Sequence, residues 1–557
     1  MHRLPAGRDS AGRGTLRREK MAGKEVLGKC IGARRPGTIW RALVVLGMVA
    51  GAGCMKVGPD FVRPEAKVLN QWLEVDDTRL RAEPVDYKEW WKAFNDPVLD
   101  KLVRMAYEQN LPLRVAGVRV FEARARLAIA VGEEYPQTQQ AFGAAAYVRE
   151  SERAPTSPQQ SRGFDFDYRQ AQVGATASWE LDFWGKFRRA VESADASFLG
   201  SIAAYDNALV TLTADVARTY VVIRTIEERL RIARENVGIQ KESLRIARVR
   251  FEGGVTSERD VQQALTLLFN TEATIPQLET TLRQAENALS ILLGLPPSQL
   301  GDLLAGGSAI PTAPLQVAVG IPADLLRRRP DVVNAELQAA AQSSLIGVAK
   351  AELFPAFSLN GTFGFLSSDV GRFKLGDITS WDSRAWAFGP SFQWNILNYG
   401  QITNLVRVQD ALFQEFVLAY QDTVLRAQQE VEDGLVVFLK AQERVVLLTE
   451  AAAAAKRSAD LALIQYREGA TDYTTVLTAE QALLSQQDSL ANQQGDVPQG
   501  LIAVYRALGG GWEIHEGQEF VPTDIKETME ERTNWGSLLK PAAVEPPPSR
   551  LFRAPDW

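Results

Sequence analysis

Residues 209–237 read LVTLTADVARTYVVIRTIEERLRIARENV, and their apolar positions recur in alternating steps of three and four. A second stretch, residues 424–452, repeats these steps 215 residues later. Such a heptad pattern predicts helices that pack side by side along a narrow apolar seam. We therefore expect long helices over residues 188–251 and 403–466, each about 95 Å long at about 1.5 Å per residue. The seam positions of the first helix are Leu209, Leu212, Val216, Thr219, Ile223, Ile226, Leu230, Ala233 and Val237.

The same offset relates other parts of the chain, which indicates a tandem duplication. Residues 250–256 (RFEGGVT) align with residues 465–471 (QYREGAT), and each motif is a glycine turn between a long helix and a returning helix. In each copy a shorter helix precedes two strand-like stretches and then the long helix. The shorter helices are expected over residues 97–132 and 330–352. The sequence therefore predicts a mainly α fold built from two long helical hairpins.

Two strand-like stretches stand in each copy, over residues 136–150 with 171–183 and over residues 355–367 with 385–397. Aromatic side chains alternate with polar ones in them, as in a soluble sheet or in the lipid face of a membrane sheet. Four strands cannot close a barrel with room inside, and an open edge in lipid costs several kcal/mol for each unpaired backbone group. Several chains must then share one barrel, although the pattern does not determine how many. The expected lipid-facing aromatic residues are Trp179, Phe183, Phe392 and Trp394.

The N-terminal region has the pattern of a secretory signal that ends in a lipid-attachment site. Basic residues precede a short apolar run, and Cys54 follows small residues at the expected cleavage point. The run is too short for a membrane-spanning helix. We expect residues 1–53 to be removed and Cys54 to carry a diacylglycerol and an N-acyl chain. An ordinary signal peptide beside a free thiol is the alternative, because Gly51 stands where such signals usually carry Leu, and translation could start at Met1 or Met21.

Composition excludes several classes of protein. The chain has a formal net charge of −6, and its leader is Arg-rich, so the remainder is more acidic still and unsuited to nucleic acid. Beyond the leader, one cysteine and one histidine remain, Cys54 and His515. No disulfide can form from them, and a single histidine makes His–Cys metal sites, Ser-His-Asp triads and Cys-His dyads close to excluded. We expect no metal, no catalytic residue and no cofactor other than lipid.

Four motifs resemble the lipidated outer-membrane efflux channels, the OprM/NodT branch of the TolC family. They are residues 57–64 (VGPDFVRP), 181–186 (LDFWGK), 254–257 (GVTS) and 321–332 (IPADLLRRRPDV). The resemblance covers about residues 54–512. It implies a homotrimer with a shared twelve-stranded transmembrane β-barrel and an α-barrel tunnel of twelve helices through the periplasm. It also implies docking to a periplasmic adaptor and an inner-membrane pump, and passive export of drugs or other small molecules.

In this interpretation the two glycine turns form the periplasmic tip of the channel. The residues expected to contact the adaptor are Gly253, Gly254, Val255, Thr256, Gly469, Ala470 and Thr471. Family members often close this end with acidic side chains, but here the corresponding positions are Thr474, Thr475 and Thr478. Our hypothesis is that Asp472 and Glu468, with Glu258 and Asp260 of the first copy, supply the remaining acidity. Ordinary solvated charges at helix ends are the alternative.

The expected organisation is a leader over residues 1–53, a lipidated N-terminal segment over 54–95, a first repeat over 96–294, a linker over 295–320, a second repeat over 321–512 and a flexible C-terminal tail over 513–557. Two rival functions remain open. One is a type I protein-secretion channel of the same architecture, and the other is a lipid-anchored periplasmic coiled-coil spacer without a pore.

Overall fold

The computed structural model describes residues 55–81, 83, 87–151, 166–307, 309–320, 322, 328–370 and 373–540. The leader, Cys54, half of the motif at residues 321–332 and residues 541–557 of the expected tail lie outside the described residues. The chain divides into two units, Met1–Gly53 and Cys54–Trp557, and the description below concerns the second.

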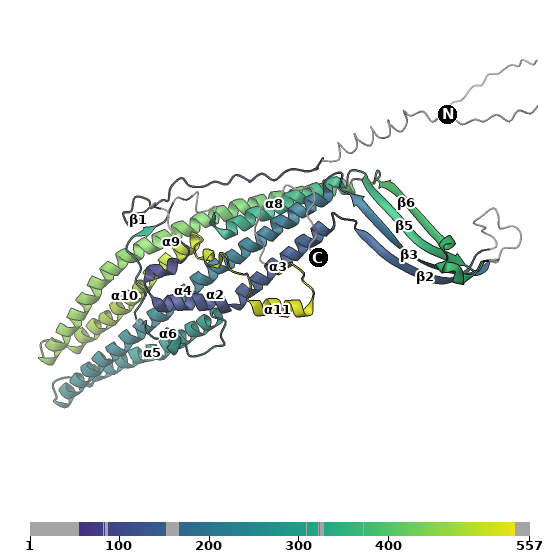
Figure 1. Cartoon of the computed structure of the whole chain (residues 1–557). Helices are drawn as coiled ribbons and strands as arrows, with labels where there is room; N and C mark the ends of the chain where they lie inside the picture. Colours follow the sequence, from purple (N-terminus) through teal and green to yellow (C-terminus); the bar gives the residue numbers. More distant parts are fainter. Residues whose placement is uncertain are drawn as a thin grey trace, which may run out of the picture. The chain divides into compact units, whose positions relative to one another are not determined.

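Two long helical hairpins form most of the structure (Figure 1). The outgoing helices are α4 (Lys186–Glu252) and α9 (Gln401–Arg467), of 67 residues each. The returning helices are α5 (Glu258–Leu292) and α10 (Tyr473–Ala507), of 35 residues each. The bounds of each pair differ by the same offset that the sequence motifs show, so the duplicated hairpins are confirmed. None of the helices in the described part of the chain is long and apolar enough to cross a membrane.

Three shorter helices accompany the hairpins: α2 (Pro97–Gln109), α3 (Leu111–Gly132) and α8 (Pro330–Ala351). The prediction of one helix over residues 97–132 is wrong at Asn110. The Asn110 side chain accepts a hydrogen bond from the Leu113 amide at 2.8 Å and so caps a new helix. Pro112, in the first turn of α3, has no amide hydrogen to continue α2.

The four predicted strands form one antiparallel sheet in the order β2-β3-β5-β6. They are β2 (Thr138–Arg149), β3 (Asp167–Leu181), β5 (Ala356–Ser368) and β6 (Arg384–Gln393). β3 leads into α4 and β6 leads into α9, so the sheet and the hairpin turns lie at opposite ends of the long helices (Figure 1). Within the described residues, β2 and β6 are each paired on one side only.

Short elements complete the second unit. The strands β1 (Leu80–Arg81) and β4 (Val317–Ala318) pair in parallel and join the N-terminal segment to the linker. The others are η1 (Trp90–Phe94), α6 (Gly301–Leu304), η2 (Leu375–Thr379), η3 (Trp381–Ser383), η4 (Trp512–His515) and α11 (Thr523–Arg532).

Residues 513–540 differ from the flexible tail that we expected. They contain α11, and Met529 and Leu539 are buried against Phe121 of α3. The Arg124 guanidinium donates to the backbone oxygens of Leu538 and Lys540. The prediction of a flexible tail is based on the proline-rich residues 542–548 (AAVEPPP), which follow this packed segment.

The core follows the predicted seams. Every seam position of α4 is buried except Thr219, which is half-buried, and Leu209, Val216 and Ile223 have no exposed area. On α9 the seam is buried from Val424 to Ala441 and becomes partly exposed beyond it. The helix α8 packs against both α4 and α9, and thereby joins the two copies.

Glycines let α9 and α10 approach closely. A Cβ atom at Gly500 would lie 2.8 Å from the Phe438 amide nitrogen, whereas one at Gly238 of α4 would meet nothing within 4 Å. We expect Gly500→Ala to cost about 1–3 kcal/mol of unfolding free energy through overpacking. The matched change Gly238→Ala should be neutral or stabilising by about 0.5–1 kcal/mol. Thermal unfolding of the two variants tests this, and equal melting temperatures would contradict the close contact.

Candidate functional site

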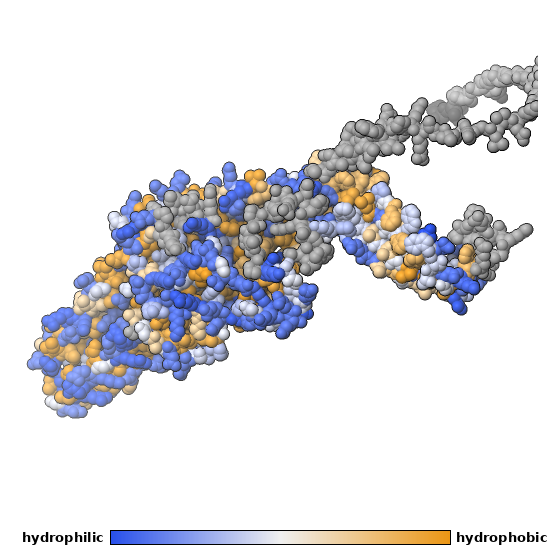
Figure 2. All heavy atoms as spheres, in the orientation of Figure 1, coloured by the Kyte–Doolittle hydropathy of each residue, from blue (hydrophilic) through white to orange (hydrophobic). Residues whose placement is uncertain are grey.

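The two faces of the sheet differ in chemistry. The strand register places Trp179 opposite Leu359, and Phe357 opposite Phe392, on one face. Two further predicted aromatic residues adjoin this face: the Phe183 ring lies 5.1 Å from that of Phe357, and Trp394 follows β6 and donates to the Leu353 carbonyl at 3.0 Å. Orange patches over the strands mark apolar residues in Figure 2. Other members of this face are Ala175, Ala177, Phe363, Phe365, Trp386 and Phe388.

The opposite face of the sheet carries hydrogen-bonding side chains. The Ser178 hydroxyl donates to Oδ1 of Asn360 at 2.7 Å, and Nδ2 of Asn360 donates to the Ser391 hydroxyl at 2.6 Å. Thr176 and Thr362 lie opposite each other on the same face, with their hydroxyl oxygens 3.4 Å apart. A sheet with one aromatic face and one polar face suits a boundary between lipid and water.

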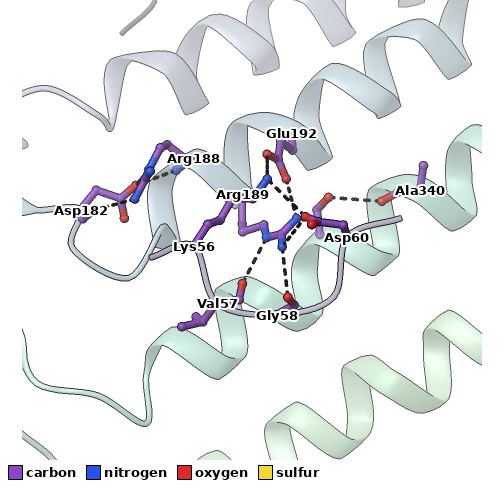
Figure 3. Close-up of polar contacts among 10 residues, drawn as sticks. Lys56, Val57, Gly58, Asp60, Asp182, Arg188, Arg189, Glu192 and Ala340 are labelled. Carbon is purple, nitrogen blue, oxygen red and sulfur yellow. Dashed lines mark hydrogen bonds and ion pairs between the residues drawn. The ribbon is translucent and has the colours of Figure 1, made fainter. Parts of the chain in front are cut away.

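A buried arginine at the start of α4 holds the N-terminal segment (Figure 3). The Arg189 side chain is 3% exposed. It donates to the backbone oxygens of Val57 and Gly58 at 3.1 and 3.2 Å, and pairs with Asp60 and Glu192 at 2.9 Å each. The guanidinium also holds the pKa of the Asp60 carboxyl below its ordinary value. This contact positions Lys56, two residues after Cys54, at the end of the sheet.

The backbone at Gly58 leaves no room for a side chain at this position. Gly58 has a φ of +95°, and a Cβ atom there would lie 2.4 Å from Cα of Gly347 in α8. Beyond it, residues 63–79 run along the second copy and are held by polar contacts. Arg63 pairs with Glu336 at 2.8 Å, and Arg79 pairs with Glu443 at 3.1 Å. The N-terminal segment therefore connects the sheet end of α4 to α8 and α9.

The two hairpin turns share one backbone geometry. In the first turn the Gly254 amide donates to the Phe251 oxygen, the Val255 amide donates to the Arg250 oxygen, and Gly254 has a φ of +72°. The second turn has the equivalent bonds, and Gly469 has a φ of +82°. This Schellman geometry needs a left-handed residue, which explains the glycine in both motifs. The predicted contact residues of both turns are exposed except Thr256 and Thr471, which are half-buried.

The predicted gate residues lie on the exposed face of the first turns of α10. Thr474, Thr475 and Thr478 are exposed, whereas the neighbouring Tyr473 and Val476 are buried. Asp472 caps the helix, because its carboxylate accepts from the Thr475 amide at 3.2 Å and from the Thr475 hydroxyl at 2.9 Å. Glu468 is exposed and lies 3.2 Å from the Arg467 guanidinium.

A contact between the hairpins near the turns was not foreseen from the sequence. The Tyr466 hydroxyl of α9 donates to Asp260 of α5 at 3.3 Å, and both residues are buried. The Arg250 guanidinium of α4 covers the Tyr466 ring at 4.8 Å and donates to the Arg467 carbonyl at 3.0 Å. Asp260 therefore belongs to the contact between hairpins and is not part of an exposed acidic tip, which corrects our hypothesis for this residue.

Together these features define a class of protein. A sheet with one aromatic and one polar face, joined to long paired helices, is the architecture of a membrane channel with a helical stalk. No group of three or more His, Cys, Asp or Glu side chains that could hold a metal ion occurs among the described residues.

Comparison with known proteins identifies the family. The model of the family "outer membrane efflux protein" matches residues 102–295 and 321–510, and the chain belongs to this family. It is an efflux channel component located in the outer membrane. The solvent efflux pump outer membrane protein SrpC of Pseudomonas putida is 31% identical over 486 residues, which cover 86% of this chain and 99% of SrpC. Nodulation protein T of Rhizobium leguminosarum bv. trifolii is 29% identical, over 83% of this chain and 95% of that protein.

Solved structures agree with this assignment. The outer-membrane channel OprN superposes with a TM-score of 0.76 at 32% identity, covering 82% of this chain and 99% of OprN. The Campylobacter jejuni CmeC channel has the same fold, with a TM-score of 0.74 at 23% identity, and covers 86% of this chain and 98% of CmeC.

Removal of the buried arginine should release the N-terminal segment. Hydrogen bonds to a charged group contribute about 1.5–3 kcal/mol, so Arg189→Gln should raise local opening about ten- to a hundredfold. Trypsin cleavage after Lys56 or Lys67 in the folded protein measures this opening. Arg231→Gln is the matched control, because Arg231 also lies on α4 and pairs with two glutamates but is 54% exposed. Equal cleavage rates in the two variants would contradict the role of Arg189.

Proposed function

We propose that this protein is a passive homotrimeric conduit, without enzymatic activity, through which small molecules leave the cell envelope. The observation that carries the proposal is an incomplete symmetry between the two copies. The returning helix α10 packs along α4, whereas α5 and α9 meet near the turns, through Asp260 and Tyr466, and do not pack along their lengths within the described part of the chain. Because the copies are equivalent, α5 of one chain is expected to pack against α9 of the next.

Two further features support a ring of chains. The edge strands β2 and β6 would join in the same way as β3 and β5 do within the chain, and three chains would supply about twelve strands. Apolar side chains are also exposed where neighbours would meet, on α3, α5 and α9. They include Leu111, Val115, Ile129, Phe269, Val446 and Leu447.

The proposed partners are a periplasmic adaptor, which meets the exposed hairpin turns, and an inner-membrane pump, which supplies the energy. Curated relatives are named for the export of solvents, toluene and pyoverdine. Since these cargoes differ widely, we propose that the conduit accepts diverse small molecules and that the pump selects among them. The relatives favour small-molecule efflux over protein secretion, and a two-faced sheet would have no role in a spacer without a pore.

The lipid proposal rests on the contact of Arg189 with residues 57–60. If Cys54 is acylated, this contact keeps the acyl chains near the membrane end of the strands, where the aromatic face of the sheet begins. Lipid and sheet would then enter the same membrane.

Electron microscopy of the detergent-extracted protein tests the assembly. We expect particles with three-fold symmetry and a hollow stalk on the order of 100 Å, as 67-residue helices at about 1.5 Å per residue require. Mass spectrometry of the same preparation should find the mature chain starting at an acylated Cys54. A solid rod, or particles without a central channel, would overturn the conduit.

The charge at the tip can be tested without loss of structure. Asp472→Asn retains helix capping, because Asn is as good a cap as Asp, and Glu468→Gln removes the second exposed charge. We expect the double variant to have a lower permeability ratio of cations to anions, measured from the reversal potential in a salt gradient. Glu530→Gln, an exposed change on α11, is the control. An unchanged ratio in the double variant would show that these carboxylates do not determine selectivity.

A further inference from the structure

A buried carboxyl group lies in the contact between the two hairpins. Glu480 of α10 is 1% exposed, and its neighbours in sequence, Ala479 and Leu483, belong to an apolar cluster that α4 also lines. The Ser243 hydroxyl of α4 donates to Oε1 of Glu480. Oε2 of Glu480 has no hydrogen-bond partner among the described residues. The hairpins are therefore joined near the tip by an acidic group that is largely removed from water.

A second buried polar group lies one helical turn before Ser243. Gln240, three residues before Ser243 on α4, is 1% exposed, and neither polar atom of its amide has a partner in the described part of the chain. Among the described residues only Ser243 donates to Glu480, and the surrounding side chains are largely apolar, so the neutral form of Glu480 suits this surrounding. An ionised carboxylate would add an unpaired charge to it, which is much less favourable.

Glu480 favours its neutral form because the carboxyl group is buried. Burial raises the pKa of the Glu480 carboxyl from its ordinary 4.5 to about 7, and the hydrogen bond from Ser243 opposes the rise. No ion pair joins Glu480 to a charged side chain among the described residues. Of the exposed cations in this part of α4, Lys241 pairs with Glu272 and Arg245 pairs with Glu242, and Arg248 is exposed to solvent. The other ionisable groups along the contact are Arg250 of α4, Asp260 of α5, Tyr466 of α9 and Tyr473 of α10.

We infer that Glu480 is a proton-dependent latch that holds the two hairpins of each chain together when it is protonated and favours their separation when it is ionised. The inference rests on the proposed function, in which the hairpin tips open to pass cargo. Separation of α10 from α4 would expose the carboxyl to water, where its ordinary affinity for a proton returns.

The direction of the pH effect follows from linkage. The joined state binds the proton more tightly than the separated state, so the joined state is favoured at low pH and loses this advantage as the pH rises from 4.5 to about 7. The equilibrium constant for separation in each chain is therefore about 300-fold larger above this pH range than below it, because the two pKa values differ by about 2.5 units and each unit is a factor of ten. Acidification should therefore close the tip.

The test is the conductance of the full-length lipidated protein in planar bilayers, from about pH 4 to about pH 8.5 on the tip side, a range that brackets the expected transition. We expect open probability to rise with pH in the unmodified protein. In Glu480→Gln it should stay at the low-pH level throughout. Ser243→Ala removes the hydrogen bond that lowers the pKa, so the transition should move to higher pH. Glu279→Gln, an exposed change on α5, is the control and should retain the original transition.

Spin labels on the two turns, at Glu252→Cys and Glu468→Cys, provide a second measurement that does not depend on current. The distance between the labels in a chain should lengthen as the pH rises, and should not change with pH when Glu480→Gln is added. A current without pH dependence, or an unchanged pH dependence in Glu480→Gln, would overturn the latch. Absence of current at every pH would instead count against the conduit itself.

Discussion

The packing of α8 between α4 and α9 is the contact on which the rest of the structure depends. The buried face of α8 is made of small residues, among them Ala339, Ser343 and Gly347, which let two long helices approach the same partner closely. This contact brings β3 beside β5, because each strand is joined to one of the packed helices. It also aligns the hairpins so that α10 reaches α4. The sheet, the anchored N-terminal segment and the paired turns all follow from that alignment.

Much of this architecture could be predicted because its determinants are local and occur twice. Apolar steps of three and four placed the long helices within two residues of their observed ends at both termini. Alternation placed the four strands and put Trp179 and Phe392 on one face. The glycine motifs placed the turns, since their left-handed backbone requires Gly at one position in each. Each of these signals depends only on near neighbours in the chain.

Contacts between distant residues carry no such signal, and there the prediction was incomplete. Asp260, Tyr466 and Glu480 correspond in the other copy to Thr475, Phe251 and Leu265, so the duplication gives no hint of their partners. The Asn110 side chain caps α3 and also donates from its amide to the Leu292 carbonyl at 2.9 Å, a contact with a residue 182 positions later in the chain. The packed segment 513–540 has no repeat counterpart and depends on α3, which lies about 400 residues earlier.

The two copies differ in the side chains that line the contact between an outgoing and a returning helix, and this difference bears on which contact opens. The face that α4 turns toward α10 carries Asn236, Gln240 and Ser243, and Nδ2 of Asn236 donates to Gln487 at 2.7 Å. The equivalent positions on α9 are Ala451, Ala455 and Ser458, and Leu265 replaces Glu480 on α5. By the symmetry of the copies, this second seam would join neighbouring chains. Exposure to water is unfavourable for an apolar seam, whereas it stabilises a carboxyl group that can ionise. In the proposed assembly, opening within each chain would therefore cost less free energy than separation between chains once Glu480 is ionised, and the tip would widen while the assembly stays intact.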